Sequence, residues 1–180
     1  LSGAVLERVR CGVVRELVCW GTASGLAAHF DRLLGALRSH SCGLSELKLV
    51  GCAWPEGRTL SELVEALPAT GLKTLAVAQM KVGGALPEAV GDKCAGAEFI
   101  ALNSLGLTGG VPASLGKCAK LKKLSLVCLQ LPLVPIHVSL GHLLVLVEAV
   151  DANISPPFGD FLAHLCERRP VLDQGRRRGL

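Results

Sequence analysis

The chain is 180 residues long, half of its residues are hydrophobic and its mean hydropathy is +0.47, which excludes a disordered class and favours one domain with a sizeable core. The formal net charge of +4 is modest, and much of it comes from arginines near the C-terminal end. With four Phe, two Trp and no Tyr, the sequence lacks the basic stripe and the stacking aromatics of a nucleic-acid surface, so no nucleic-acid partner is expected.

The first thirteen residues predict a short helix. Val5, Leu6 and Val9 fall on one helical face. We interpret residues 1–13 as an N-terminal cap or as the remnant of a preceding repeat. If no cap lies upstream, the strand that follows would be an open sheet edge, which invites pairing with another chain.

Residues 14–154 carry one apolar frame six times: an apolar residue, two variable residues, an apolar residue, one variable residue and an apolar residue. The frame starts at positions 14, 44, 72, 97, 121 and 144, so the unit shortens along the chain. Such a frame predicts a short strand whose alternate side chains point into a core. One unit cannot bury these side chains alone, so the units are expected to stack on one another. The six triplets are Val14/Leu17/Cys19, Leu44/Leu47/Leu49, Leu72/Leu75/Val77, Ala97/Ile100/Leu102, Leu121/Leu124/Leu126 and Leu144/Val147/Ala149.

The segments between the strands differ in the early and the late units. Apolar residues recur at helical spacing from Leu26 to Leu37 and again from Leu60 to Leu67, which predicts one amphipathic helix over 26–37 and another over 60–67. In the later units, Pro87 and Pro112 limit any helix to about one turn.

On these motifs the chain resembles the leucine-rich repeat family over essentially its whole length. The early units look like ribonuclease-inhibitor-type repeats, and LTGGVPASLGKCAKLKKL (residues 107–124) is similar to the plant-type repeat phrase. The resemblance implies an α/β solenoid of about six repeats, with a parallel β-sheet on its concave face and helices or short turns on its convex face. The inward position that is usually asparagine holds no amide here; its residues are Thr22, Cys52, Met80, Leu105, Leu129 and Ala152.

The C-terminal part predicts a capping helix over 155–170, with Phe158, Phe161, Leu162 and Leu165 on one face, and a basic tail over 171–180. The stretch between Lys123 and Glu148 has no charged residue and is long enough to cross a bilayer. Because prolines interrupt it and the repeat frame passes through it, no membrane span is expected.

The eight cysteines form no C-x-x-C pair, so no metal site is predicted, and several fall at inward positions where a thiol acts as a small hydrophobe. The simplest interpretation is an intracellular, reducing compartment such as the cytoplasm; a secreted protein with paired cysteines is the alternative. The glycines before Lys117-Cys118 are one residue too far apart for a phosphate loop. We therefore expect no cofactor and no enzyme activity.

In this architecture function lies on the strand face, where curvature gathers the outward residues of successive strands. We expect a non-catalytic protein-protein interaction module, with Trp20, Val50, Asn103 and Val127 as central contacts on that face. The alternative is a permanent structural subunit of a large multiprotein assembly. The complete set of candidate partner-binding residues is Trp20, Lys48, Val50, Gln79, Asn103, Lys123, Val127, Glu148 and Asp151.

Overall fold

The computed structural model describes residues 1–108, 111–126 and 144–146. The chain divides into two compact units, Leu1–Ala149 and Val150–Leu180, and every described residue lies in the first unit. The expected capping helix over 155–170 and the basic tail over 171–180 lie outside the described residues, as do three of the candidate partner-binding residues, Val127, Glu148 and Asp151.

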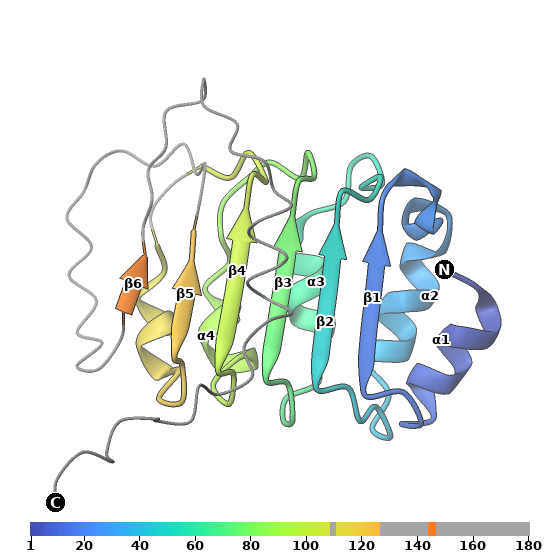
Figure 1. The fold of residues 1–180 in the computed structure, drawn as a ribbon, viewed down its shortest axis with the longest axis horizontal. Helices are drawn as coiled ribbons and strands as arrows, with labels where there is room; N and C mark the ends of the chain where they lie inside the picture. Colours follow the sequence, from blue (N-terminus) through green and yellow to red (C-terminus); the bar gives the residue numbers. More distant parts are fainter. Residues whose placement is uncertain (109–110, 127–143, 147–180) are drawn as a thin grey trace, which may run out of the picture. The chain divides into compact units, whose positions relative to one another are not determined.

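The fold is α/β and is built on one parallel sheet in which the strands follow each other in chain order, from β1 to β6 (Figure 1). Each strand is short, as the repeat frame predicts. The strands are β1 (Glu16–Trp20), β2 (Glu46–Val50), β3 (Thr74–Ala78), β4 (Phe99–Asn103), β5 (Lys123–Ser125) and β6 (Leu144–Leu146).

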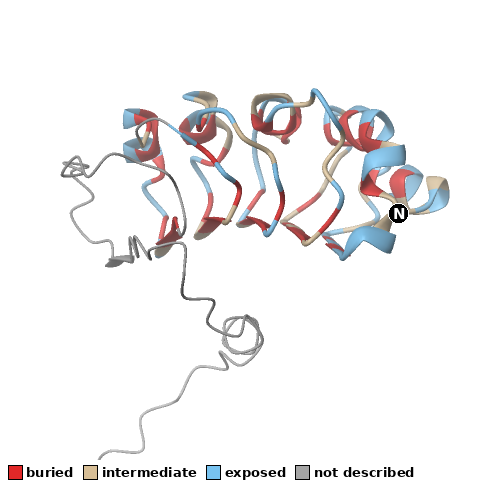
Figure 2. Cartoon of the chain, turned by 90° about the horizontal axis from the view of Figure 1, so that it is seen from above, coloured by how far each residue is buried: buried red, intermediate tan, exposed pale blue. Residues whose placement is uncertain are grey.

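The helices form a second layer on one side of this sheet, as the view from above shows (Figure 2). The expected helices are confirmed: α2 covers Leu26–Leu37, and α3 covers Leu60–Ala66. Helix α3 begins at a capping box formed by Thr59 and Glu62 and ends before Leu67, whose extended backbone (ψ 144°) is typical of the residue before a proline. The helix at the N-terminus, α1, covers Gly3–Arg10.

Past β3 the second layer thins, because a proline precedes each segment. After Pro87 the chain forms only α4 (Ala89–Lys93), and after Pro112 only the 3-10 helix η2 (Ala113–Lys117). A further 3-10 helix, η1 (Thr22–Ser24), follows β1. The prediction of long early and short late segments is confirmed.

The core lies between the two layers, and the first five frames stack in it in the expected register. The residues that occupy the second position of each frame lie opposite one another across the sheet and are all buried. They join the buried faces of the helices in one cluster. The row consists of Leu17, Leu47, Leu75, Ile100 and Leu124.

The prediction of the sixth frame is wrong by two residues. The frame predicts Val147 at its second position, but the residue opposite Leu124 is Val145, so the residue opposite Ser125 is Leu146 and not Glu148. The four residues from Leu144 to Val147 are all apolar. Because side chains in a strand alternate with a period of two, a shift by two leaves the pattern unchanged, and this run cannot tell the two registers apart.

Two sets of backbone hydrogen bonds repeat from strand to strand. At the start of each strand, one carbonyl oxygen accepts bonds from two successive N–H groups of the next unit, over 2.7 to 3.2 Å. At the end, an N–H group donates to the last carbonyl of the next strand, over 2.9 to 3.0 Å. The accepting carbonyls at the start belong to Arg15, Ser45, Lys73 and Glu98, and the donors at the end are Gly21, Gly51 and Gln79.

The turns after the strands are held without asparagine. The Cys52 thiol donates to the carbonyl of Cys19 over 3.3 Å, and the carbonyl of Leu105 accepts from the N–H groups of Val82 and Gly83. Thr22 was expected to point inward, but it is exposed because η1 begins directly after β1.

Candidate functional site

The outer sheet face is the face of the sheet that points away from the helices. It is formed by Glu16, Val18 and Trp20 of β1 and by the residues that lie opposite them on the following strands. The strand register confirms the two rows expected from the frame as far as β5. These rows are Val18, Lys48, Ala76, Ala101 and Ser125, and Trp20, Val50, Ala78 and Asn103.

Accessibility along these rows differs from the expectation. Trp20 is 50% exposed and its neighbour Val18 is 38% exposed, whereas Val50 is 6% exposed and Asn103 only 1%. Val50 and Asn103 are therefore buried in this structure, and their role as central contacts stays a prediction. Asn103 also uses its side-chain oxygen as the acceptor for the hydroxyl of buried Ser125, over 3.2 Å.

Beside the exposed tryptophan lies a small charged group on β1 and β2. The Lys48 ammonium contacts the Glu46 carboxylate at 2.7 Å and the Glu16 carboxylate at 3.1 Å. Partial burial disfavours the charged ammonium, but the hydrogen bonds and negative charges of Glu46 and Glu16 outweigh burial and raise the pKa of Lys48. The expected polar contact Lys48 is thus a charged, ordered group next to Val18.

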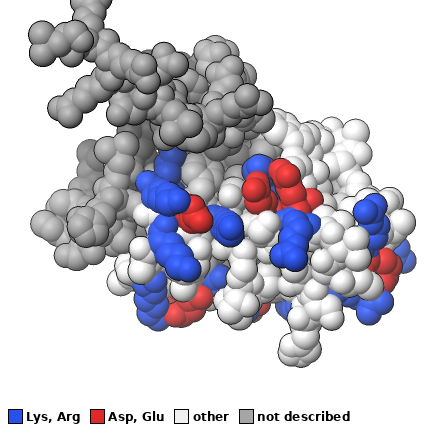
Figure 3. Space-filling model, turned by 60° about the horizontal axis from the view of Figure 1, so that its bottom comes forward, with Lys and Arg blue, Asp and Glu red and all other residues white. Residues whose placement is uncertain are grey.

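The other described candidates lie elsewhere on the face. The Lys123 ammonium lies 5.8 Å from the centre of the Phe99 ring, within the range of a cation–π contact. Gln79 is exposed at the end of β3. Because Lys48 lies on β2 and Lys123 on β5, the structure does not bring the two lysines together. In the view with the bottom of the molecule forward, basic and acidic side chains are interspersed (Figure 3).

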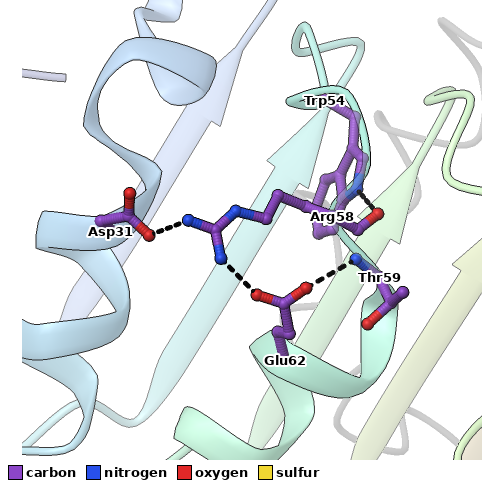
Figure 4. A network of polar contacts seen from close by, with 5 residues as sticks. All are labelled: Asp31, Trp54, Arg58, Thr59 and Glu62. Carbon is purple, nitrogen blue, oxygen red and sulfur yellow. Dashed lines mark hydrogen bonds and ion pairs between the residues drawn. The ribbon is translucent and has the colours of Figure 1, made fainter.

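A polar network that sequence reasoning missed joins α2 to the loop before α3 (Figure 4). The Arg58 guanidinium binds the Glu62 carboxylate at 2.6 Å and also pairs with Asp31, while the Trp54 indole N–H donates to the Arg58 carbonyl over 2.9 Å. The Trp54 ring packs edge-on against Phe30 at 4.9 Å. The only sequence signal is the spacing of four between Arg58 and Glu62, and the network fastens neighbouring units rather than forming a site.

The buried thiols are poor nucleophiles. Burial raises the pKa of Cys94 to about 12, and burial likewise raises the pKa values of Cys19 and Cys118. Since the thiolate is the reactive form, these groups stay protonated near neutral pH. Within the described ranges, no group of three or more His, Cys, Asp or Glu side chains is placed to hold a metal ion.

Comparison with known proteins assigns no family to this chain. Neither the protein-family models nor the curated proteins that were searched match this chain. In the described part of the chain, no helix is both long enough and apolar enough to span a bilayer.

Proposed function

We propose that this chain is a leucine-rich repeat solenoid that acts as a non-catalytic protein-interaction module. The solenoid is supported by five frames that stack in register and by backbone bonds that repeat at each junction. A module of this kind recognises its partner with its sheet face and needs no chemistry of its own.

The proposal rests on the positions of the exposed apolar side chains. Among the described residues, the exposed large hydrophobic side chains are Val13, Val18 and Trp20, and all three lie on β1 or just before it. Tryptophan is enriched at the centres of protein interfaces, where charged groups form the rim. Trp20 and Val18, beside Lys48 and its carboxylates, have this composition.

The cysteines support a reducing compartment for this module. Every described cysteine is a free thiol, and four of the six are buried. Buried thiols serve as small core residues, which suits an intracellular protein.

Site-specific photo-crosslinking tests the proposal. A photoreactive amino acid is placed at position 18 of the full chain, or at Glu65, which is exposed on α3 in the helix layer. After irradiation in an extract of the chain's own source, a discrete protein adduct is expected from position 18 and not from position 65.

The Trp20→Ala variant is the control for the patch. It should lose most of the adduct from position 18 while its circular dichroism stays unchanged, because Trp20 is half exposed and lies on the outer sheet face. Equal adducts at positions 18 and 65, or an adduct that does not depend on Trp20, would place the interaction elsewhere.

A further inference from the structure

The segment that leads from α1 into β1 lies against the segment that leads from α2 into β2. The Ser39 hydroxyl donates to the Arg10 carbonyl over 3.0 Å, and the Ser45 hydroxyl donates to the Arg15 carbonyl over 2.9 Å. These bonds join residues that are 29 and 30 positions apart, so the two segments run side by side in the same direction.

Each of these segments carries one cysteine, and the contacts between the segments bring the two cysteines to adjacent positions. A Cβ atom on Gly12 would overlap the carbonyl oxygen of Ser41 and would lie 3.5 Å from the backbone nitrogen of Gly43. Ser41 and Gly43 flank Cys42, so Gly12 faces Cys42 across the junction between the first two units. The residue directly before Gly12 is Cys11.

The spacing of the two backbones suits a disulfide. A Cβ atom on Gly43 would lie 3.6 Å from the Cα atom of Gly12, so the Cα atoms of these glycines are no more than about 5 Å apart. Disulfides join residues whose Cα atoms lie about 4.4 to 6.8 Å apart. Because the segments run in parallel and glycine has no side chain, nothing at positions 12 and 43 keeps Cys11 away from Cys42.

The two thiols are also the most accessible ones in the described part of the chain. Cys11 is exposed and Cys42 is partly exposed, whereas the other four described cysteines are buried. Thiol–disulfide exchange needs a thiol that a reagent in solution can reach. Among the described cysteines, this pair is therefore the one suited to react while the chain stays folded.

We propose that Cys11 and Cys42 are a redox-sensitive pair that forms a disulfide when oxidised glutathione accumulates, and that this bond fastens the first two units together. The inference goes beyond the proposed interaction function and does not depend on it. The bond would lie five residues before β1 and four residues before β2, and would limit the movement of one strand relative to the other.

The reaction proceeds in two exchange steps. The thiolate of one cysteine attacks a sulfur of glutathione disulfide, which forms a mixed disulfide and releases one glutathione thiolate. The thiolate of the second cysteine then attacks the protein sulfur of this mixed disulfide, forms the bond between Cys11 and Cys42, and releases the second glutathione thiolate. The two cysteines lose two electrons, glutathione disulfide gains them, and the two thiol protons pass through solvent to the released thiolates.

Peptide mapping of the full chain tests the pair. The reduced, folded chain is equilibrated with oxidised glutathione, remaining thiols are blocked by an alkylating reagent, and the chain is digested with trypsin without reduction. Cleavage after arginine and lysine gives the peptides 11–15 and 39–48, each of which holds a single cysteine. A disulfide-linked pair of these peptides is identified by its mass and by its disappearance on reduction.

Most molecules should yield the linked pair of peptides, while Cys19, Cys52, Cys94 and Cys118 stay unmodified. The oxidised chain should also unfold at a urea concentration about 1 M higher than the reduced chain, because the bond closes a loop in the unfolded state.

The Cys11→Ser variant is the matched control. Because position 11 is exposed, this variant should keep the circular dichroism of the unchanged chain. It should give no linked peptide and no rise in the urea midpoint, and its Cys42 should instead carry one glutathione.

Three results would overturn the proposal. In the first, Cys11 and Cys42 each carry glutathione but do not link, which would mean that the two thiols cannot meet. In the second, neither thiol reacts, or the link forms only in urea, which would mean that the folded chain does not offer the pair. In the third, the link forms but leaves the urea midpoint unchanged, so that it does not fasten the two units. None of these results bears on the crosslinking test at position 18, which judges the interaction function separately.

Discussion

The residue that ends each strand turns the chain through a left-handed conformation. Gly21 and Gly51 have φ angles of 68° and 63°, and the equivalent Gln79 and Ser104 adopt 56° and 53°. Glycine takes this conformation without the steric cost that a Cβ atom imposes. Gln79 and Ser104 adopt the left-handed conformation although each has a Cβ atom, which shows that the turn geometry is set by the repeat and not by the local residue.

Replacing Gly51 with alanine isolates this backbone cost. The nearest atom to the added Cβ would lie 3.8 Å away, so Gly51→Ala should lower the free energy of unfolding by about 1 kcal/mol through the left-handed φ alone. Gly35→Ala in α2, where nothing lies within 4 Å and φ is not positive, should instead raise it by about 0.5 to 1 kcal/mol. Urea denaturation of the two variants measures both changes, and a loss of equal size in each would contradict the argument.

The buried Cys94 makes stability depend on pH in alkaline solution. Its thiol has a pKa of about 12 in the folded protein, against an ordinary value of 9.0. Above pH 9 the unfolded chain releases a proton that the folded chain keeps, so the unfolded state binds fewer protons and stability falls as pH rises. The contribution at pH 10 is a loss of about 1 kcal/mol.

The Cys94→Ala variant provides the reference. Under reducing conditions, its free energy of unfolding should fall less between pH 8 and pH 10 than that of the unchanged chain, whatever its stability at pH 8. Identical pH slopes would mean that the thiol ionises as readily in the folded protein as in the unfolded one.

Side-chain direction was more predictable than side-chain exposure. The frame assigned Val18, Lys48 and Val50 correctly to the outward rows, because alternation along a strand is strictly local. Whether such a side chain meets solvent is not encoded in the frame. Trp20 at the edge and Val50 one strand further in share a row but differ in exposure from 50% to 6%.

Among the elements, the short segments α4 and η2 pack closely because a glycine lies between them. A Cβ atom on Gly91 would lie 1.9 Å from the carbonyl oxygen of Ser114. The matching glycine of the next unit, Gly116, has nothing within 4 Å. The two glycines each stand four residues after a proline, Pro87 or Pro112, yet only the first is needed for packing.

The two glycine positions should therefore differ in how well they tolerate alanine. Gly91→Ala forces backbone atoms apart and should cost about 2 kcal/mol of stability, whereas Gly116→Ala should change it by less than about 0.5 kcal/mol. Thermal and urea unfolding of both variants measure the difference. A Gly91→Ala protein as stable as the Gly116→Ala protein would show that the two segments can separate without loss.

The elements themselves were largely predictable, since each depended on a pattern within about a dozen residues. The amphipathic spacing located α2 and α3, and the prolines limited α4 and η2. The network around Arg58 was not predictable, because it joins residues of different units whose approach depends on how the helices stack.

For the described unit as a whole, stability should be highest in the middle strands. β3 is paired on both sides by full five-residue strands, whereas β1 is paired on one side only among the described residues. In a structure stabilised by contacts between neighbouring units, the end units have a neighbour on one side only. Amide hydrogen exchange is therefore expected to be fastest at the ends.

The paired amides of β3 should therefore exchange at least tenfold more slowly than the paired amides of β1, measured on the full chain by NMR. The comparison uses Leu17 and Cys19 in β1, whose N–H groups face β2, so that unpaired edge amides do not enter it. Equal protection of the two strands would indicate one cooperative unit without an ordered end.

The repeated carbonyl acceptors at the strand starts bear on how a chain of this kind can gain or lose whole units in evolution. Four unlike residues, arginine, serine, lysine and glutamate, make the same pair of bonds there, because the acceptor is the main chain. A duplication or loss that runs from one of these carbonyls to the next therefore leaves no unpaired group at the seam. The sheet face can gain or lose whole strands, and a new binding surface can arise before any of its side chains has changed.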